Sequence, residues 1–473
     1  MDFLFLFFVS SLICGGLQFY IHLKKKNITN ESENNNNNNS INNKKNNNKN
    51  GTLLDIGRSE DVNNKSEIDK SNFFTENEEK QFKKFQNKYL LTYLLAMASD
   101  WLQGPYVYAL YESYGYSKQE IAILFIFGFL SSLVFGMAVG PIIDKYGRKK
   151  MGIIFGIFYG FSCLTKVINS FSILLIGRLL GGIATSLLFS VFESWMIAEH
   201  NSRGFKEELL ASTFYKSSLL NGLIAILSGL FASEVANRWG YVSPFLWAFS
   251  LLVVCSIIIA TQWNENYGDS SSSLIETLKT SIQTSYNSPG IISIGIVQSF
   301  FEASMYTFVF MWTPTLSESP DLIGVQLPFG LIFATFMVCV MIGSSIFNLL
   351  SHIKPELLIQ YILLFSSICF VIPFYFKNSL LIYMSFLSFE VLCGCYFPCI
   401  GTLRSKYIPE SIRATVMNLY RVPLNILVVT ILLNIERLSN QRTFLSCAIW
   451  LIISLAYYRI FISRSQELIK VNK

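Results

Sequence analysis

The chain has 473 residues, of which 52% are hydrophobic and 14% are charged. Soluble globular proteins carry about 25% charged residues, so much of this chain's surface must face something other than water. The net charge of +6 is small for this length, and the basic residues cluster in short loops, which argues against nucleic-acid binding.

The first predicted element is an apolar block at residues 3–21, which is followed by Lys24, Lys25 and Lys26. No basic segment precedes this block and no clear small-x-small cleavage pattern follows it. These features favour a retained anchor helix over a cleaved signal peptide. We therefore assign residues 1–26 to an N-terminal transmembrane helix.

Residues 27–87 come next, and they are polar and rich in asparagine, with an unbroken run from Asn34 to Asn39. A segment of this composition cannot bury enough apolar surface to offset the entropy of ordering it. We expect residues 27–87 to be disordered.

Apolar blocks recur from residue 88 onward. About 20 residues of helix cross the hydrocarbon core of a bilayer, and inside lipid a helix satisfies its own backbone groups. Twelve spans are predicted, at residues 88–110, 121–142, 150–168, 171–192, 212–232, 241–261, 290–313, 326–350, 357–376, 379–402, 412–434 and 443–462. The polar stretch 262–289 separates two six-helix halves, residues 88–261 and residues 290–473.

Basic residues in alternate loops fix the orientation, because cytoplasmic loops carry an excess of lysine and arginine. One set of loops is the richer, with Lys145, Arg148, Lys149, Lys150, Arg203, Lys206, Lys279, Lys354, Arg404, Lys406 and Arg413. The other set carries Lys118, Arg238, Lys377, Arg437 and Arg442. The first set is therefore predicted to be cytoplasmic, together with the Asn-rich segment and the C-terminus.

One loop carries a distinctive motif, Gly140-Pro-Ile-Ile-Asp144-Lys-Tyr-Gly147-Arg148-Lys-Lys. It resembles the signature loop of the major facilitator superfamily, and Arg178-Leu-Leu-Gly-Gly182 in the fourth span resembles a second signature of these proteins. Gly147 suits a tight turn. Asp144 can pair with a nearby basic group in one conformation and release it in another, so we expect Asp144 and Arg148 to take part in gating on the cytoplasmic side.

The two halves look like copies of one six-helix unit. Several residues recur at nearly constant separation, pairing Asp100 with Glu302, Arg178 with Glu390, Gly182 with Gly394, Tyr215-Lys216 with Tyr420-Arg421, and Gly140 with Gly343. Duplication of a transmembrane unit leaves this pattern.

Five of these residues are charged and lie deep in predicted spans: Asp100, Arg178, Glu302, Glu390 and Arg421. A charge at the bilayer centre costs at least ~2.5 kcal/mol on insertion scales, so each should face the interior of the bundle and have a partner. The alternative is that these groups form salt bridges that only stabilise one state of a gate.

A closer resemblance rests on Ala98-Ser-Asp-Trp-Leu-Gln-Gly-Pro-Tyr106, Phe192-Glu-Ser-Trp195, Trp263-Asn-Glu-Asn-Tyr267, Trp312-Thr-Pro314, Ile408-Pro-Glu410 and Tyr420-Arg-Val-Pro-Leu424. Together these segments resemble the eukaryotic molybdate-anion transporter family of the major facilitator superfamily. The resemblance implies an all-α membrane fold of two pseudo-symmetric six-helix bundles, preceded by one extra N-terminal transmembrane helix. It also implies uptake of molybdate by alternating access around a central cavity.

The residues agree with this chemistry, because a desolvated dianion needs cations and several donors. Arg178 and Arg421 are the best candidates, since a guanidinium matches the edge of an oxyanion. Lys216 and Lys166 are secondary cations, and Tyr106, Gln103 and Asn425 are neutral donors.

The deep carboxylates, Asp100, Glu302 and Glu390, would repel an anion if they were ionised. We expect them to be paired with the basic residues or protonated by burial. Protonatable carboxylates beside an anion site are also what proton-coupled transport requires, so proton coupling is a hypothesis.

The sequence shows no zinc spacing, nucleophile–base pair or phosphate loop, so neither an enzyme nor a cofactor is predicted. Cys393, Cys395 and Cys399 are interpreted as packing residues rather than metal ligands. Three alternatives stay open: a porter for sulfate or a sugar, an organic-cation porter, and a membrane receptor that transports nothing. We expect a monomer in the lipid bilayer, most simply in the plasma membrane.

Overall fold

The computed structural model describes residues 2–21, 23, 61–268 and 274–471, and all regular structure among these residues is helical. The chain divides into two compact units, one of them Gly15–Leu91 and the other made of Met1–Cys14 and Thr92–Lys473. The smaller unit contains the second part of the N-terminal helix Phe3–Ile21 and the first part of α2 (Asp61–Gln103).

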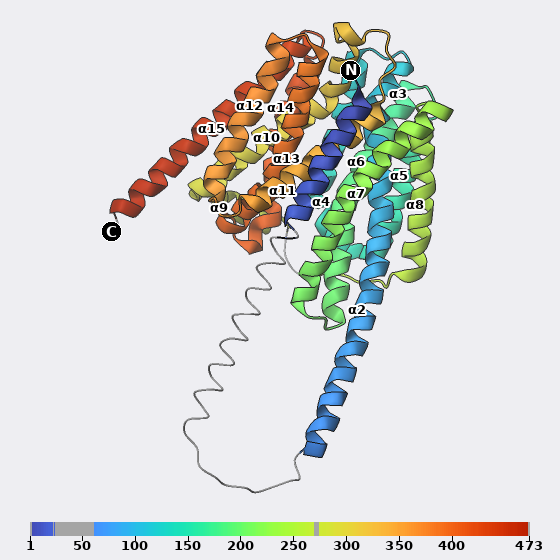
Figure 1. The fold of residues 1–473 in the computed structure, drawn as a ribbon, viewed down its shortest axis with the longest axis vertical. Coiled ribbons are helices and arrows are strands. Elements are labelled where there is room, and N and C mark those ends of the chain that lie inside the picture. Colours follow the sequence, from blue (N-terminus) through green and yellow to red (C-terminus); the bar gives the residue numbers. More distant parts are fainter. Residues whose placement is uncertain (1, 22, 24–60, 269–273, 472–473) are drawn as a thin grey trace. The chain divides into compact units, whose positions relative to one another are not determined.

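The larger unit holds two sets of helices that follow one another along the chain (Figure 1). The first set begins with the end of α2 and continues through η1 (Gly104–Tyr106), α3 (Val107–Ser113), α4 (Lys118–Tyr146), α5 (Arg148–Thr165), α6 (Phe171–Ser202), α7 (Glu207–Trp239) and α8 (Ser243–Gln262). After α9 (Leu274–Asn287), the second set comprises α10 (Pro289–Ser317), η2 (Pro320–Leu322), α11 (Phe329–Leu349), α12 (Pro355–Tyr375), α13 (Ser379–Tyr407), α14 (Glu410–Leu433) and α15 (Asn440–Val471).

Both sets pack by one scheme. In the first set α4 packs on α6 and α5 packs on α6 and α8, while in the second set α11 packs on α13 and α12 packs on α13 and α15. Between the sets α4 contacts α14 and α7 contacts α11. The second helix of each half therefore meets the fifth helix of the other, which confirms the predicted pair of pseudo-symmetric six-helix bundles.

Glycines allow the closest of these contacts. Gly182 of α6 lies against Gly128 and Ser131 of α4, and Gly394 of α13 lies against Gly343 of α11. A methyl group at any of these glycines would clash with the neighbouring helix. The pairing of Gly182 with Gly394, inferred from sequence, thus has a structural counterpart in the two halves.

Eleven helices among the described residues are long and apolar enough to cross a membrane, and they confirm a multi-pass membrane protein. The N-terminal helix Phe3–Ile21 is one of them. The predicted first and third core spans are not among the eleven. The first carries Asp100 and is interrupted at Gly104-Pro105, and α5 begins with three basic residues.

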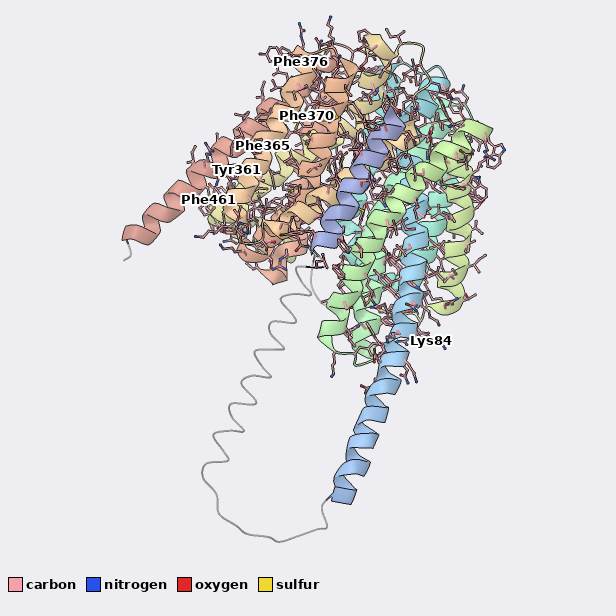
Figure 2. The ribbon with its side chains drawn as sticks, viewed as in Figure 1. Lys84, Tyr361, Phe365, Phe370, Phe376 and Phe461 are labelled. Atoms are coloured by element: carbon pink, nitrogen blue, oxygen red, sulfur yellow. The ribbon has the colours of Figure 1, made fainter. Side chains whose placement is uncertain are left out.

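The outer face of α12 illustrates the membrane character (Figure 2). Tyr361 is 46% exposed and Phe365 is 50% exposed, and their rings stack on one face of the helix. Phe370 points the other way and is fully buried. A row of exposed aromatic side chains is costly in water and favourable against lipid, so this face is lipid-facing.

The extra N-terminal helix has contacts within the larger unit. The Phe3 ring lies edge-on to Tyr383 of α13 at 5.3 Å, and Ser10 interacts with Cys339 of α11. Most of its other side chains are apolar and exposed, including Leu12 at 76%. The part of the helix up to Cys14 therefore packs on the C-terminal bundle through one narrow stripe.

Two sequence-based expectations need correction. Residues 61–87 were expected to be disordered, but they belong to α2, in which Glu79 pairs with Lys83 one turn away at 2.7 Å. Residues 27–60 of that segment lie outside the described residues. Arg404 was assigned to a cytoplasmic loop, but α13 continues to Tyr407 and carries Arg404 into the bundle.

Candidate functional site

The signature loop between α4 and α5 forms a tight turn at Gly147, whose φ of +100° is one that residues with a side chain rarely adopt. Arg148 begins α5 and pairs with Asp144, one turn back in α4, at 2.8 Å. The structure thus joins the two residues that the sequence assigned to gating.

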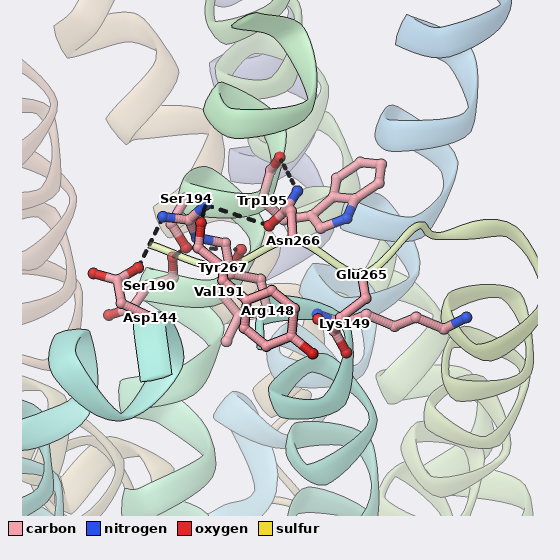
Figure 3. Close-up of polar contacts among 10 residues, drawn as sticks. All are labelled: Asp144, Arg148, Lys149, Ser190, Val191, Ser194, Trp195, Glu265, Asn266 and Tyr267. Atoms are coloured by element: carbon pink, nitrogen blue, oxygen red, sulfur yellow. Dashed lines mark hydrogen bonds and ion pairs between the residues drawn. The ribbon is translucent and has the colours of Figure 1, made fainter. Parts of the chain in front are cut away.

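A short segment after α8 holds this turn, and we call its residues 263–268 the linker clasp (Figure 3). Both carboxylate oxygens of Glu265 accept hydrogen bonds from backbone N–H groups in the first turn of α5, those of Lys149 and Lys150. Arg148 donates to the Asn266 side chain and to the Tyr267 carbonyl. An acidic group suits this position because the N-terminus of a helix carries unsatisfied donors and partial positive charge.

Aromatic stacking fixes the other side of the linker clasp. The Trp263 ring stacks on Trp195 of α6 with centroids 4.0 Å apart. The Trp195 indole N–H donates to the Asn264 carbonyl, and the Asn266 amide donates to the Trp195 carbonyl. All these partners belong to the N-terminal half, so the linker clasp fastens the start of the interdomain linker to that half.

The N-terminal half contains one cluster of deep polar groups. Tyr159 of α5 donates a short hydrogen bond to Asp100 of α2, and Tyr159 also interacts electrostatically with Arg178 of α6. Lys166, at the end of α5, is buried and donates to the carbonyl and hydroxyl of Ser162.

Arg178 is held against α4. Its Nε donates to the Leu124 carbonyl at 3.1 Å, and its guanidinium lies over the Phe125 ring at 4.7 Å. A Cβ at Gly128 would lie 2.6 Å from Nη2, so only glycine leaves room for this guanidinium. Arg178 is half-buried in this position.

The C-terminal half contains a second cluster, centred on Glu302 of α10. Arg404 of α13 pairs with Glu302 at 3.1 Å and also donates to Gln298 at 3.0 Å. The Tyr396 hydroxyl donates to the same Glu302 carboxylate. The side chains of Arg404 and Glu302 are only 16% and 13% exposed, so this is a largely buried ion pair.

Arg421 of α14 reaches across to the N-terminal half. A Cβ at Gly136 of α4 would lie 3.1 Å from its Nη1 and 3.5 Å from the Ser186 hydroxyl of α6. The guanidinium also interacts with Glu302 and with the Tyr306 hydroxyl, whose oxygen accepts a hydrogen bond from it. Arg421 therefore lies where helices of both halves meet.

The remaining predicted residues lie elsewhere. Tyr106 packs on Tyr241 and Phe329 and interacts with Ser233, and the Gln103 amide turns back to the Ser99 carbonyl. Lys216 is exposed on α7, and the Asn425 amide donates to the backbone of Arg421.

Glu390 is buried in α13 near Cys339 and Cys393, and within the described part of the chain its carboxyl has neither a hydrogen bond nor an ion pair.

Sequence reasoning missed several members of these clusters: Tyr159, Ser132, Ser186, Gln298, Tyr306, Tyr396 and Arg404. Tyr306 lies one turn from Glu302 on α10, a spacing that could have indicated a shared face. Arg404 follows the last apolar window of α13, so hydropathy assigned it to a loop. The Ser132–Ser186 pair joins two helices, and each serine alone carries no signal.

A polar contact joins the two halves at the other end of α4. Lys118 hydrogen-bonds to Asn440 of α15 and lies 3.7 Å from Glu318 at the end of α10. Glu112, in the last turn of α3, lies nearby. Its pKa is raised above its ordinary value, chiefly by partial burial and then by the Glu318 carboxylate, with Lys118 acting in the opposite direction. On the predicted topology this contact lies on the extracellular or lumenal side.

Apart from Glu390, each half contributes a carboxylate and two cations to the interior: Asp100 with Lys166 and Arg178, and Glu302 with Arg404 and Arg421. Among the described residues, Arg404 alone of the four cations has a carboxylate within 4.0 Å. Cations without an ion pair in a low-dielectric interior attract an anion and would lower its desolvation cost.

A family model of the major facilitator superfamily, described as sugar transporters with 12 transmembrane segments, matches residues 60–394. Two solved structures share the fold: the nucleoside transporter NupG (TM-score 0.64, 12% identity, 80% of this chain and 98% of that one) and the peptide transporter POT in complex with sulfate (TM-score 0.64, 14% identity, 81% and 94%). The protein is therefore a membrane transporter of the major facilitator superfamily and not an enzyme.

Relatives of higher sequence identity show which family of the superfamily the chain belongs to. A protein named molybdate-anion transporter from Xenopus tropicalis is 35% identical over 394 residues, covering 79% of this chain and 85% of that protein. One of the same name from Takifugu rubripes is 31% identical over 381 residues, covering 73% and 78%. The chain belongs to the molybdate-anion transporter family, as its sequence segments had indicated.

Proposed function

We propose that this protein takes up molybdate across a membrane and that Arg421 is its principal anion-binding side chain. The observation that carries the proposal is the position of Arg421, whose guanidinium lies between α14, α4 and α10 without a carboxylate within 4.0 Å in the described part of the chain. The names of the curated relatives supply the substrate, which is a tetrahedral dianion at neutral pH.

Arginine suits this task because its planar donors match two oxyanion oxygens at once. Ser186 lies beside Gly136, as Arg421 does, and its hydroxyl hydrogen-bonds with that of Ser132. These two hydroxyls supply neutral donors of the kind a dianion needs. Arg178 and Lys166 form a second positive group in the N-terminal half. Lys216, Tyr106 and Gln103 stay predictions as substrate-binding residues.

We propose alternating access, with the structure corresponding to a state closed on the outer side. Contacts between the halves at the outer ends support this, such as Lys118 with Asn440 and Gly229 of α7 with Gly330 of α11. Toward the inner ends, Tyr146 of α4 and Tyr215 of α7 are exposed. The Asp144–Arg148 turn, fastened by the linker clasp, would then act as a gating element on the cytoplasmic side.

We also propose that transport is coupled to protons through Glu302, with Asp100 and Glu390 as further proton-binding candidates. Glu302 supports the idea because it touches Arg404 and interacts with Arg421, so its charge state changes the field at the anion site. Uptake that does not vary with pH and carries no proton current would count against coupling.

We further propose that the protein is a monomer in the plasma membrane and that its C-terminus is cytoplasmic.

The decisive experiment is uptake of labelled molybdate at nanomolar concentration, with sulfate and a neutral sugar as competitors. Arg421→Gln should abolish uptake at equal surface expression, Arg178→Gln should reduce it, and Arg442→Gln, at an exposed position, is the matched control. Full uptake by Arg421→Gln would reject the site. A wild type that takes up the sugar and no molybdate would reject the substrate.

A further inference from the structure

Aromatic side chains from both halves meet between α3, α4 and α10. Phe129 of α4 stacks on Tyr306 of α10, with ring centroids 5.4 Å apart and planes at 17°. Phe310, one turn further along α10, meets Tyr108 of α3 at 5.3 Å and Phe125 of α4 at 5.1 Å, both edge-on. We call these five side chains the aromatic barrier, because each of the three contacts joins the two halves.

Both arginines touch the aromatic barrier, at different depths. Arg178 rests on Phe125 and against Gly128, whereas Arg421 meets Tyr306 and lies against Gly136. Gly128 and Gly136 are about two turns apart on α4, a rise of ~12 Å at 1.5 Å per residue. Since α4 starts on the outer side in the predicted topology, Arg178 lies nearer the outer side than Arg421, at the level of Phe125, and Arg421 lies inward of the barrier.

Tyr306 takes part both in the aromatic barrier and in the contact with Arg421. Its ring forms the stacked contact with Phe129, and its hydroxyl interacts with the Arg421 guanidinium. Tyr306 and Arg421 come from the same half, whereas Phe129 and Gly136 come from the other. When the halves separate on the outer side, the contacts to α4 break together while the Tyr306–Arg421 contact can persist.

We propose that Tyr306 is a positioning residue that orients the Arg421 guanidinium for the anion and closes the outer path through its stack on Phe129. The inference rests on the proposed function, because it takes Arg421 as the anion-binding group. A guanidinium has five donors in a fixed plane, and holding one of them on the Tyr306 oxygen fixes the direction of the others. Losing this hydroxyl would leave a mobile cation, and the anion would have to order it on binding.

The two roles can be separated by substitution. Tyr306→Phe keeps the ring and removes the hydroxyl, so KM for molybdate should rise about tenfold, the usual size for a hydrogen bond to a charged group. Phe129→Leu keeps the hydroxyl and removes the stack, so it should loosen the barrier and change KM less. Tyr306→Leu should produce both effects.

Barrier closure can be measured with a membrane-impermeant thiol reagent applied from outside. All nine native cysteines are buried free thiols, so background labelling should be low. Asn418→Cys places a half-buried thiol about one turn inward of Arg421 on α14, beside Gly136. Its labelling rate should rise several-fold with Phe129→Leu or Tyr306→Leu and stay at the parental rate with Tyr306→Phe.

An unchanged KM in Tyr306→Phe would overturn the positioning role. Parental labelling rates in both Phe129→Leu and Tyr306→Leu would overturn the barrier, and having two such variants protects the test if one of them fails to reach the surface. A wild type without molybdate uptake would refute the proposed function instead, and the labelling arm would still decide whether the barrier exists.

Discussion

The Arg421 guanidinium fills the space that a side chain at Gly136 would need, since a Cβ there would lie 3.1 Å from Nη1. This contact joins α14 of one half to α4 of the other. It is tight enough that a methyl group must displace the neighbour, and the neighbour is the free end of a flexible side chain. A substitution at Gly136 can therefore move the guanidinium without unfolding the bundle.

Gly136→Ala should raise KM for molybdate several-fold and leave the amount of folded protein at the surface unchanged. Concentration-dependent uptake, corrected for surface expression, measures this. Gly401→Ala is the matched control, because a Cβ at Gly401 of α13 meets nothing within 4 Å. Equal KM values for Gly136→Ala and Gly401→Ala would show that the position of Arg421 does not matter for binding.

The Glu302–Arg404 pair should behave as a coupled unit. Removing one partner of a buried ion pair leaves the other charge uncompensated and costs about 3–5 kcal/mol, whereas removing both costs much less. Thermal unfolding in detergent of Glu302→Gln, Arg404→Gln and the double variant forms a double-mutant cycle. We expect each single variant to melt well below the double variant. Strictly additive losses would mean that the two groups are solvated independently.

The sequence was sufficient to predict the helical architecture, because long apolar blocks permit few other structures in lipid. The duplication was also readable, since Arg178 and Glu390 each lie one turn before a glycine, Gly182 and Gly394, that packs on the second helix of its half. Arg178 meets Gly128 on that helix, and Glu390 neighbours Cys339 on the equivalent one. The nearly constant separation between equivalent residues of the two halves made the duplication visible in the sequence.

The pairing of deep charges could not be predicted in the same way. Arg404 looked like a loop residue because the apolar window ends before it, and its pairing with Glu302 depends on how α13 packs against α10. Tyr306 carries no charge, and although its spacing from Glu302 indicates a shared face, its contact with Arg421 of α14 could not be predicted from that spacing. Such contacts join distant parts of the sequence, and residue spacing within one helix does not encode them.

The linker clasp should stabilise the N-terminal half through the Glu265 carboxylate. Glu265→Ala removes the acceptor for two backbone N–H groups of α5 and should lower the free energy of unfolding by about 1 kcal/mol, as the loss of a helix cap does. Glu265→Gln keeps one acceptor oxygen and should lose less. Melting temperatures in detergent measure both, with the exposed Glu234→Ala as control. Equal melting temperatures for all three variants would show that the linker clasp contributes nothing.

Acid should tighten the outer contact through Glu112. Its raised pKa means that the closed arrangement binds a proton more readily than an open one in which the carboxyl is hydrated and separated from Glu318. Closure should therefore weaken as pH rises above the ordinary carboxyl value of 4.5, and strengthen as pH falls toward it. Outside labelling of Asn418→Cys, normalised to the exposed Lys377→Cys, should slow on acidification. Glu112→Gln should remove this pH dependence. The same slope with and without Glu112 would assign the effect to another group.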